Sequence, residues 1–128
     1  MHENEIAKVI VDVAYHVHRT LGPGLLESAY QAIMAYELQK RGLHVEQQVP
    51  VPVVWETVQV DIGYRIDLLV SDAVIVELKS VEQAAPVHKK QLLTHLRLAA
   101  KRLGLLINFG ESLIKNGISR VVNGLTDT

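Results

Sequence analysis

Three charged side chains interrupt the most apolar stretch of the chain, residues 64–80. We predict two short strands here, joined by a turn at Ser71-Asp72, because valine, leucine and isoleucine fill both flanks. Strands that are apolar on both faces usually lie inside a sheet that is covered on both sides. An isolated charge buried there costs several kcal/mol unless it is paired or binds a metal. Asp67, Glu77 and Lys79 are therefore candidates for a chemical role.

The length of the turn decides whether these three side chains meet. Glu77 and Lys79 are two residues apart in a strand, so they point to the same face. A three-residue turn, 71–73, would place Asp67 opposite Glu77 with its side chain on that face. A two-residue turn would place Asp67 on the other face. In the three-residue register, two carboxylates and one ammonium converge on one spot.

This D-x(9)-E-x-K set suits the hydrolysis of phosphodiesters. Carboxylate oxygens from Asp67 and Glu77 are ligands that Mg²⁺ or Mn²⁺ prefers, and such a metal lowers the pKa of a bound water. Lys79 could orient the attacking water or stabilise the negative charge that develops on the phosphate. The alternative is a structural ion pair on a half-exposed strand, which is the more common reason for these three residues taken alone.

The composition is that of a soluble globular protein. With 128 residues, 48% of them hydrophobic and 21% charged, the chain is expected to form a single domain over residues 1–128. No apolar run is long enough to cross a bilayer and no charged-then-apolar leader is seen, so we expect no membrane partner. The chain has no cysteine, which excludes disulfides and thiolate metal sites and favours a cytoplasmic location.

Positive charge is concentrated in one segment, although the net charge is only -1. No acidic residue occurs between positions 83 and 110, whereas Lys89, Lys90, Arg97 and Lys101 all fall there. We predict that these four residues form a positive surface that binds nucleic acid. The alternative is an ordinary solvated helix face.

The periodicity of apolar residues predicts the elements that carry these side chains. Helices are expected at residues 3–21, 24–41 and 86–102, and strands at 45–54, 58–63, 64–70, 74–80, 103–109 and 118–122. The fold class is therefore α/β (α+β), with a mixed sheet flanked by helices. Pro50 and Pro52 restrict the first strand to a sheet edge or to bulges. His16 and His18 do not share a helix face, so we expect both on the surface.

Five short motifs occur in a fixed order along the chain. They are Gly24-x-x-Glu27-x-x-Tyr30, Tyr64-Arg65-Ile66-Asp67, Val76-Glu77-Leu78-Lys79, Gln91-Leu92-Leu93 and Gly104-Leu105-Leu106-Ile107-Asn108-Phe109. Together they resemble the PD-(D/E)XK nuclease superfamily with its restriction-endonuclease-like core, and more closely the bacterial GxxExxY protein family. The resemblance implies a metal-dependent nuclease that has Glu27, Asp67, Glu77 and Lys79 in its site and Gln91 in support.

In this set, Glu27 would join Asp67 and Glu77 as a metal ligand. Glu27 also falls in the first turn of its helix, where the helix dipole favours a carboxylate by up to about 1 kcal/mol. That second explanation needs no metal.

Three further residues have an open role. Tyr30 either supports the site or packs in the core with its hydroxyl bonded. Arg65 is expected on the same strand face as Asp67, where it pairs with a carboxylate or binds phosphate. His95 stands where the family pattern has a tyrosine, four residues after Gln91. Histidine can still donate a hydrogen bond or contact a phosphate, but it is shorter and titrates near neutral pH.

Two hypotheses on function follow. The main one is a Mg²⁺-dependent nuclease that acts on DNA, with a homodimer similar to Holliday-junction resolvases as one form of it. The rival is a nucleic-acid-binding or regulatory module that keeps the nuclease fold without turnover. The complete set of Glu, Asp, Glu and Lys favours the enzyme.

Overall fold

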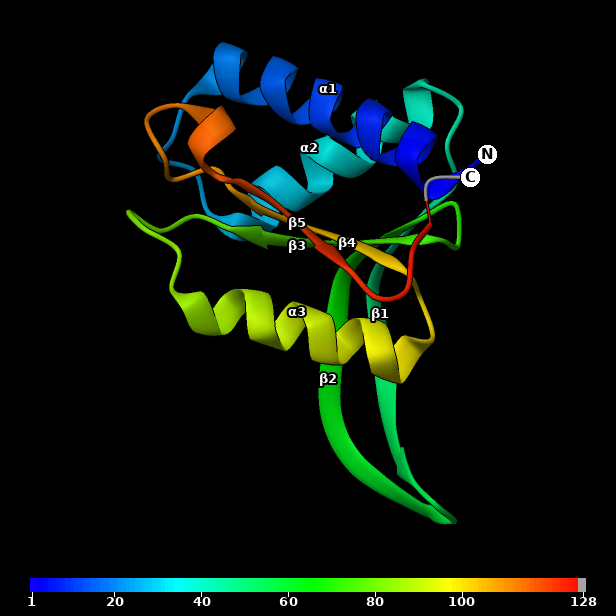
Figure 1. Ribbon diagram of the computed structural model, residues 1–128. Helices are drawn as coiled ribbons and strands as arrows, with labels where there is room; N and C mark the ends of the chain where they lie inside the picture. Colours follow the sequence, from blue (N-terminus) through cyan, green and yellow to red (C-terminus); the bar gives the residue numbers. More distant parts are fainter. Residues whose placement is uncertain (127–128) are drawn as a thin grey trace.

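Five strands form one mixed sheet with helices on both of its faces (Figure 1). The computed structural model describes residues 1–126. Its elements are α1 (Glu3–Leu21), α2 (Glu27–Lys40), β1 (Val45–Trp55), β2 (Val58–Val70), β3 (Val74–Lys79), α3 (Pro86–Ala99), β4 (Leu103–Asn108), the 3-10 turn η1 (Ile114–Asn116) and β5 (Ile118–Val122). The strand order is β1-β2-β3-β4-β5, and among these described strands only β3 and β4 are parallel neighbours. The expected mixed sheet flanked by helices is confirmed.

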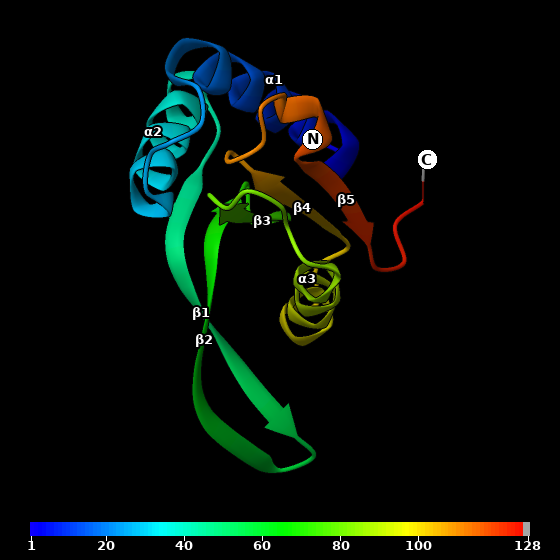
Figure 2. The same ribbon diagram turned by 90° about the vertical axis from the view of Figure 1, so that its left-hand side faces the viewer.

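The helices cover the two faces of the sheet unequally. In Figure 2, α1 and α2 lie on one face and α3 lies alone on the other. The position of α3 follows from the chain path, because a connection between parallel strands such as β3 and β4 must cross a face of the sheet. None of the helices in the described part of the chain is long and apolar enough to span a membrane.

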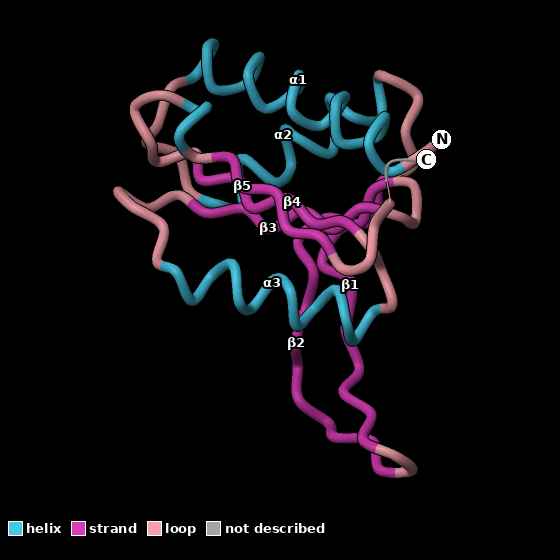
Figure 3. Tube along the Cα trace, viewed as in Figure 1, coloured by secondary structure: helices cyan, strands magenta, loops and turns pink. Residues whose placement is uncertain are grey.

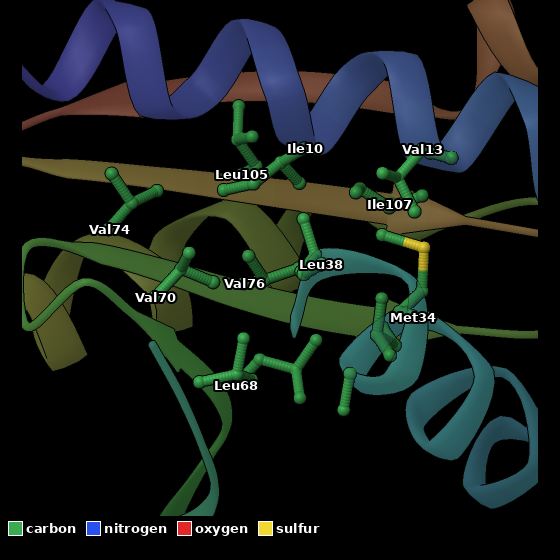
Figure 4. Close-up of a cluster of buried hydrophobic side chains, with 14 of the residues drawn as sticks. Ile10, Val13, Met34, Leu38, Leu68, Val70, Val74, Val76, Leu105 and Ile107 are labelled. Carbon is green, nitrogen blue, oxygen red and sulfur yellow. The ribbon is translucent and has the colours of Figure 1, made fainter. Parts of the chain in front are cut away.

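The face under α1 and α2 holds the main hydrophobic core. Apolar side chains from both helices pack on side chains of β2, β3 and β4, and all of the contributing residues shown are buried: Ile10, Val13, Met34, Leu38, Leu68, Val70, Val74, Val76, Leu105 and Ile107 (Figure 4). The face under α3 has a smaller cluster, made of Val51, Ile66, Leu69, Ile75, Leu92, Leu96 and Leu106. The first face therefore supplies most of the apolar burial that stabilises the fold.

The turn between β2 and β3 has the three-residue form. Leu68 pairs with Val76 and Val70 pairs with Val74, so residues 71–73 make the turn. Ser71 and Asp72 both have left-handed backbones, with φ of 53° and 54°. The register that places Asp67 and Glu77 side by side is thus the one that the chain adopts.

The second helix, expected over residues 24–41, begins later, at Glu27, and ends at Lys40. Beyond α2, Gly42 has a φ of 86°, and the N–H of Leu43 donates to the Leu38 carbonyl at 3.2 Å, which is a Schellman motif. One prediction on α1 is wrong. His18 is only 8% exposed, and its Nε2 lies 2.8 Å from the Glu111 carbonyl oxygen, because the loop after β4 closes over it.

The third helix ends earlier than predicted, at Ala99 rather than at residue 102. Ala100 takes a left-handed conformation with φ of 56°, and the N–H of Lys101 donates back to the Leu96 carbonyl at 2.9 Å. Lys101 therefore lies outside the helix. Its Nζ is 2.8 Å from the Asp72 carbonyl oxygen and 3.2 Å from Asp72 Oδ1, so it is held by the β2–β3 turn.

The strands expected at residues 58–63 and 64–70 are one continuous strand, β2. Its pairing with β1 shifts between Val51 and Val53, where three residues of β2 face one of β1. Such a bulge bends a ribbon without breaking it. We call residues 51–63 the arm: the β1–β2 ribbon leaves the sheet here and extends past α3 (Figures 1 and 3). As expected for a strand with two prolines, β1 lies at the sheet edge.

Candidate active site

The strand β3 places two charged side chains on the face that α3 covers. Ile75 belongs to the cluster under α3, whereas Val76 and Leu78 belong to the core under α1 and α2. Side chains alternate along a strand, so Glu77 and Lys79 point toward α3. Both line a cavity of about 580 Å³ with Gln91, Lys90 and His95 of α3. The carboxylate, the ammonium and the amide that the sequence predicted for the site therefore share one cavity.

Asp67 sits where β2 leaves β3. The pairing of these strands ends at Leu68 and Val76, and one position further the Oδ2 of Asp67 accepts the Leu78 N–H at 2.8 Å. The carboxylate thus takes the bond that a strand carbonyl would otherwise accept. Its other oxygen, Oδ1, accepts from Gln48 Nε2 at 3.2 Å. Asp67 is half-buried and lies next to Glu77 in the register, but it does not line the cavity of about 580 Å³.

Glu27 approaches the same edge of β3 from α2. Its Oε1 lies 3.4 Å from the backbone nitrogen of Ser80, two residues beyond the nitrogen that Asp67 binds. The hydroxyl of Ser80 donates to the Leu25 carbonyl at 2.6 Å, which ties the start of α2 to the end of β3. Glu27 is exposed and does not line the cavity.

Tyr30 fixes the loop that leads into α2. The residue is fully buried, and its ring stacks on Phe109 with 4.2 Å between centroids. Its hydroxyl donates to the Gly22 carbonyl and accepts the Leu25 N–H at 3.3 Å. Tyr30 is thus a core aromatic with a bonded hydroxyl, and it acts on the site only by holding the loop before Glu27. This contact gives the Tyr30 of the Gly24-x-x-Glu27-x-x-Tyr30 motif a structural role.

His95 contacts the carboxylate of Glu77. Its Nδ1 lies 3.4 Å from Glu77 Oε1, and both side chains are 14% exposed. The ring of His95 also packs at a tilt against Tyr64 of β2, with 5.7 Å between centroids. The histidine that replaces the usual tyrosine therefore has a partner inside the site.

Some of the other predicted residues line the cavity and some do not. Lys90 and Gln91 line it, whereas Lys89 and Arg97 lie on exposed positions of α3 that do not line it. Lys101 is bound to Asp72 outside the helix. Arg65 is exposed, and its Nη1 donates to the Gln48 carbonyl at 3.4 Å rather than to a carboxylate.

Three polar residues position the site and were not predicted. Gln48, with a φ of 51°, links Asp67 to Gln31 of α2 through a bond of 2.6 Å. Ser80 binds the loop before α2. Asn108, the parallel neighbour of Lys79, accepts the N–H groups of Val81 and Gly110 at 3.1 and 3.0 Å and so fixes the chain after β3. Only Asn108 had a sequence signal, as a polar residue at the end of an apolar run.

The donor set fits a hard divalent cation held by few protein ligands. Among the residues that the structure describes, no group of three Asp, Glu or His side chains could hold a metal, so Glu27 does not join Asp67 and Glu77 in one ready-made cluster. Mg²⁺ is commonly held by one or two carboxylates together with waters and substrate phosphates. Asp67 and Glu77 are both half-buried and occupy the positions that follow the last pair of β2 and β3, Leu68 and Val76, so they are the two carboxylates that could supply such a pair.

Comparisons with known proteins agree with this geometry. A family model described as the PD-(D/E)XK nuclease superfamily matches residues 4–121. Neither a search of curated proteins nor a search of solved structures finds a match to this chain.

Proposed function

We propose that this chain, which belongs to the PD-(D/E)XK nuclease superfamily, hydrolyses phosphodiester bonds in DNA with the help of Mg²⁺ or Mn²⁺. Membership of the superfamily suggests a nuclease and a nucleic acid substrate. The observation that carries the proposal is the shared cavity under α3, where Glu77 and Lys79 of one strand face Gln91 of the helix.

Asp67 and Glu77 are the residues that would hold the metal. A bound divalent cation would polarise the phosphate and lower the pKa of a water. The chain's own contribution is to orient the two carboxylates: the Leu78 N–H and Gln48 fix Asp67, and His95 contacts Glu77. Glu27 holds the Ser80 N–H and so steadies the end of the strand beside Lys79.

Lys79 is suited to stabilise charge on the reacting phosphate. The ion pairs within 4.0 Å among the described residues join other side chains, and none includes Lys79. A structural ion pair with Glu77 or Asp67, the alternative for these residues, would have required such a contact. The half-buried ammonium is instead directed at the cavity, where a positive charge stabilises a developing anion more than it would in water.

Nucleic acid would reach the site over α3. Its exposed Lys89, Lys90 and Arg97 stand on a helix without a single acidic residue, so phosphates meet no repulsion there. Lys101 contributes less in this proposal because Asp72 already holds it. We also assign the chain to the GxxExxY family, since Tyr30 and Glu27 give its motif a physical role, and we propose that it acts as a homodimer on branched DNA.

Two substitutions separate a nuclease from an inert module. Asp67→Asn keeps the shape of the side chain but removes a charge from the metal site, so Mg²⁺ affinity and cleavage should fall together. Lys79→Ala removes no ligand, so Mg²⁺ should still bind while cleavage falls about 100-fold, the usual scale for losing one charge-stabilising group. The substrates are nicked, branched and single-stranded DNA, and calorimetry measures the binding of Mg²⁺.

Asp12→Asn and Lys8→Ala are matched controls, because both residues are exposed on α1. They should leave cleavage and metal affinity unchanged. If the parent cleaves no substrate with Mg²⁺ or Mn²⁺ and both site substitutions only lower the melting temperature, the charges are structural and the proposal is wrong.

A further inference from the structure

One face of the arm carries an apolar strip that continues from the active-site cavity. Val51 is buried under α3, and Val53 lines the cavity. Trp55 follows on the same face, because side chains of alternate residues point to the same side of a strand. On β2, the cross-strand partners are Val60 opposite Val53 and Val58 opposite Trp55. The strip therefore passes from buried to open surface along the arm.

The outer end of this strip is open to solvent. Trp55 is 73% exposed and Val58 is 57% exposed. At the inner end, Tyr64 is 44% exposed, lines the cavity and packs on His95. The arm passes beside α3 and its tip curves below that helix (Figure 2). Tyr64 and Trp55 thus lie at the two ends of the apolar strip, which forms one wall of the cavity and continues beyond it.

The opposite wall is cationic rather than apolar. Lys90 and Thr94 of α3 line the cavity, and Arg97 lies one turn further along the same exposed stripe. By contrast, residues 51–63 of the arm contain no lysine or arginine, and the two charged residues there, Glu56 and Asp61, are acidic and lie outside the apolar strip of Val53, Trp55, Val58 and Val60 in the sequence. One wall is therefore suited to phosphates and the other to the faces of bases.

We propose that the cavity, together with the apolar strip that continues from it, binds unpaired nucleotides, with phosphates along α3 and bases stacked on Tyr64 and Trp55. This inference rests on the nuclease function proposed above. Single-stranded nucleic acid is held by this pairing of a basic groove with aromatic platforms, each worth a substantial share of affinity. In a duplex the faces of the bases are covered by their neighbours, so an uncharged aromatic wall gains little from it. The substrate class is thus a single strand, or the unpaired end or flap of a branched DNA.

The length of the strip sets the number of nucleotides. Trp55 lies four residues along β1 from Val51, the partner of Tyr64. At about 3.3 Å per residue this is roughly 13 Å, which accommodates up to about four nucleotides where their bases keep the stacked spacing of roughly 3.4 Å found along a duplex strand.

The test uses Trp55 as its own reporter, because the chain has one tryptophan. Fluorescence is measured in EDTA, which prevents cleavage, while the full chain is titrated with a 12-nucleotide single strand, a blunt duplex, or a duplex with a six-nucleotide overhang. We expect the single strand and the overhang to quench the emission and the blunt duplex to leave it unchanged. Trp55→Ala should weaken binding of the single strand about tenfold or more, measured by anisotropy of a labelled strand, and leave the blunt duplex unaffected.

Two further variants control for loss of fold. Trp55→Phe keeps a stacking ring and should restore most of the affinity. Tyr64→Ala should weaken the single strand as Trp55→Ala does, whereas Tyr36→Ala, which removes an exposed tyrosine from α2, should not.

Three outcomes would overturn the inference. Equal binding of the single strand by the parent and Trp55→Ala would do so, as would equal loss of the single strand and the duplex. Parent emission that depends on protein concentration without DNA, together with a dimer of the parent that is absent in Trp55→Ala, would assign the arm to a second copy of the chain. The nuclease proposal fails separately: if the parent cleaves duplex with Mg²⁺ while Trp55 never responds, only the stacking wall is wrong.

Discussion

The two faces of the sheet divide stability from chemistry, and the strand β3 shows this within six residues. Val74, Val76 and Leu78 point into the core under α1 and α2, and each is at most 1% exposed. Glu77 and Lys79, one residue away in each case, point to the face under α3 and remain half-buried beside a cavity. The same backbone therefore serves a packed interior on one side and charged groups on the other.

This difference explains why a functional site benefits from a sheet face that is covered by a single helix. Charged groups that are removed from water without partners cost several kcal/mol, so they need a face on which water and ligands still reach them. A single helix that buries only Leu92 and Leu96 leaves that access. The two helices on the other face bury enough apolar surface to hold the sheet in shape while the α3 face is shaped by the site.

The largest expected effect is a difference in stability between two substitutions on opposite faces of β3. Leu78→Ala should destabilise the protein by about 2–5 kcal/mol, because it leaves a cavity in the main core. Lys79→Ala, one residue away, should change the free energy of unfolding by less than about 0.5 kcal/mol. Urea denaturation of both variants measures this. Equal loss of stability would mean that the two faces do not differ as described.

Two histidines, His18 of α1 and His95 of α3, should show the same division between stability and cleavage with smaller effects. His95→Ala should lower cleavage about tenfold, since it removes the neighbour that orients Glu77, and should barely change stability. His18→Ala should instead cost about 1–2 kcal/mol of stability, because the Glu111 carbonyl loses its partner, and should leave cleavage of the folded protein unchanged. The reverse assignment, with His18 needed for turnover and His95 for folding, would contradict the account.

The smallest effect is expected at the rim of the core face. Glu3 binds Arg102 through two bonds of 2.8 and 2.9 Å. A hydrogen bond from its own backbone N–H, together with the Arg102 guanidinium, holds the pKa of the Glu3 carboxyl below its ordinary value despite the opposing effect of burial. A lowered folded-state pKa stabilises the fold above the unfolded pKa of about 4.3, and this contribution is lost as the pH falls through the folded-state value.

Glu3→Gln should therefore cost up to about 1 kcal/mol at pH 7, and the difference from the parent should shrink at pH 3. Urea denaturation at both pH values measures it. A difference that is independent of pH would show that the charge of Glu3 does not contribute.

Much of this division could be predicted from the sequence. Alternation along 74–79 predicts that Glu77 and Lys79 share one face, whereas the sequence leaves the length of the turn, and with it the register of Asp67, open until the structure shows the three-residue form with left-handed Ser71 and Asp72. The ends of the first two helices, expected at residues 21 and 41, lie at Leu21 and Lys40.

The failures share a physical cause, which is contact between residues far apart in the chain. The sequence predicts two strands, at 58–63 and 64–70, where β2 is continuous, because the bulge opposite Val51 and Val53 depends on cross-strand pairing. His18 was placed on the surface because the loop that covers it starts after β4. Gln48 gave no signal because its role depends on meeting both Asp67 and Gln31 in space.

The metal site is tested by a crystal of the protein soaked in Mn²⁺ and measured at the manganese absorption edge. We expect one anomalous peak within about 2.0–2.3 Å of carboxylate oxygens of both Asp67 and Glu77, lost in Asp67→Asn and retained in Lys79→Ala. A structure that lacks this peak at saturating Mn²⁺, or that binds the ion away from these two carboxylates, would contradict this expectation.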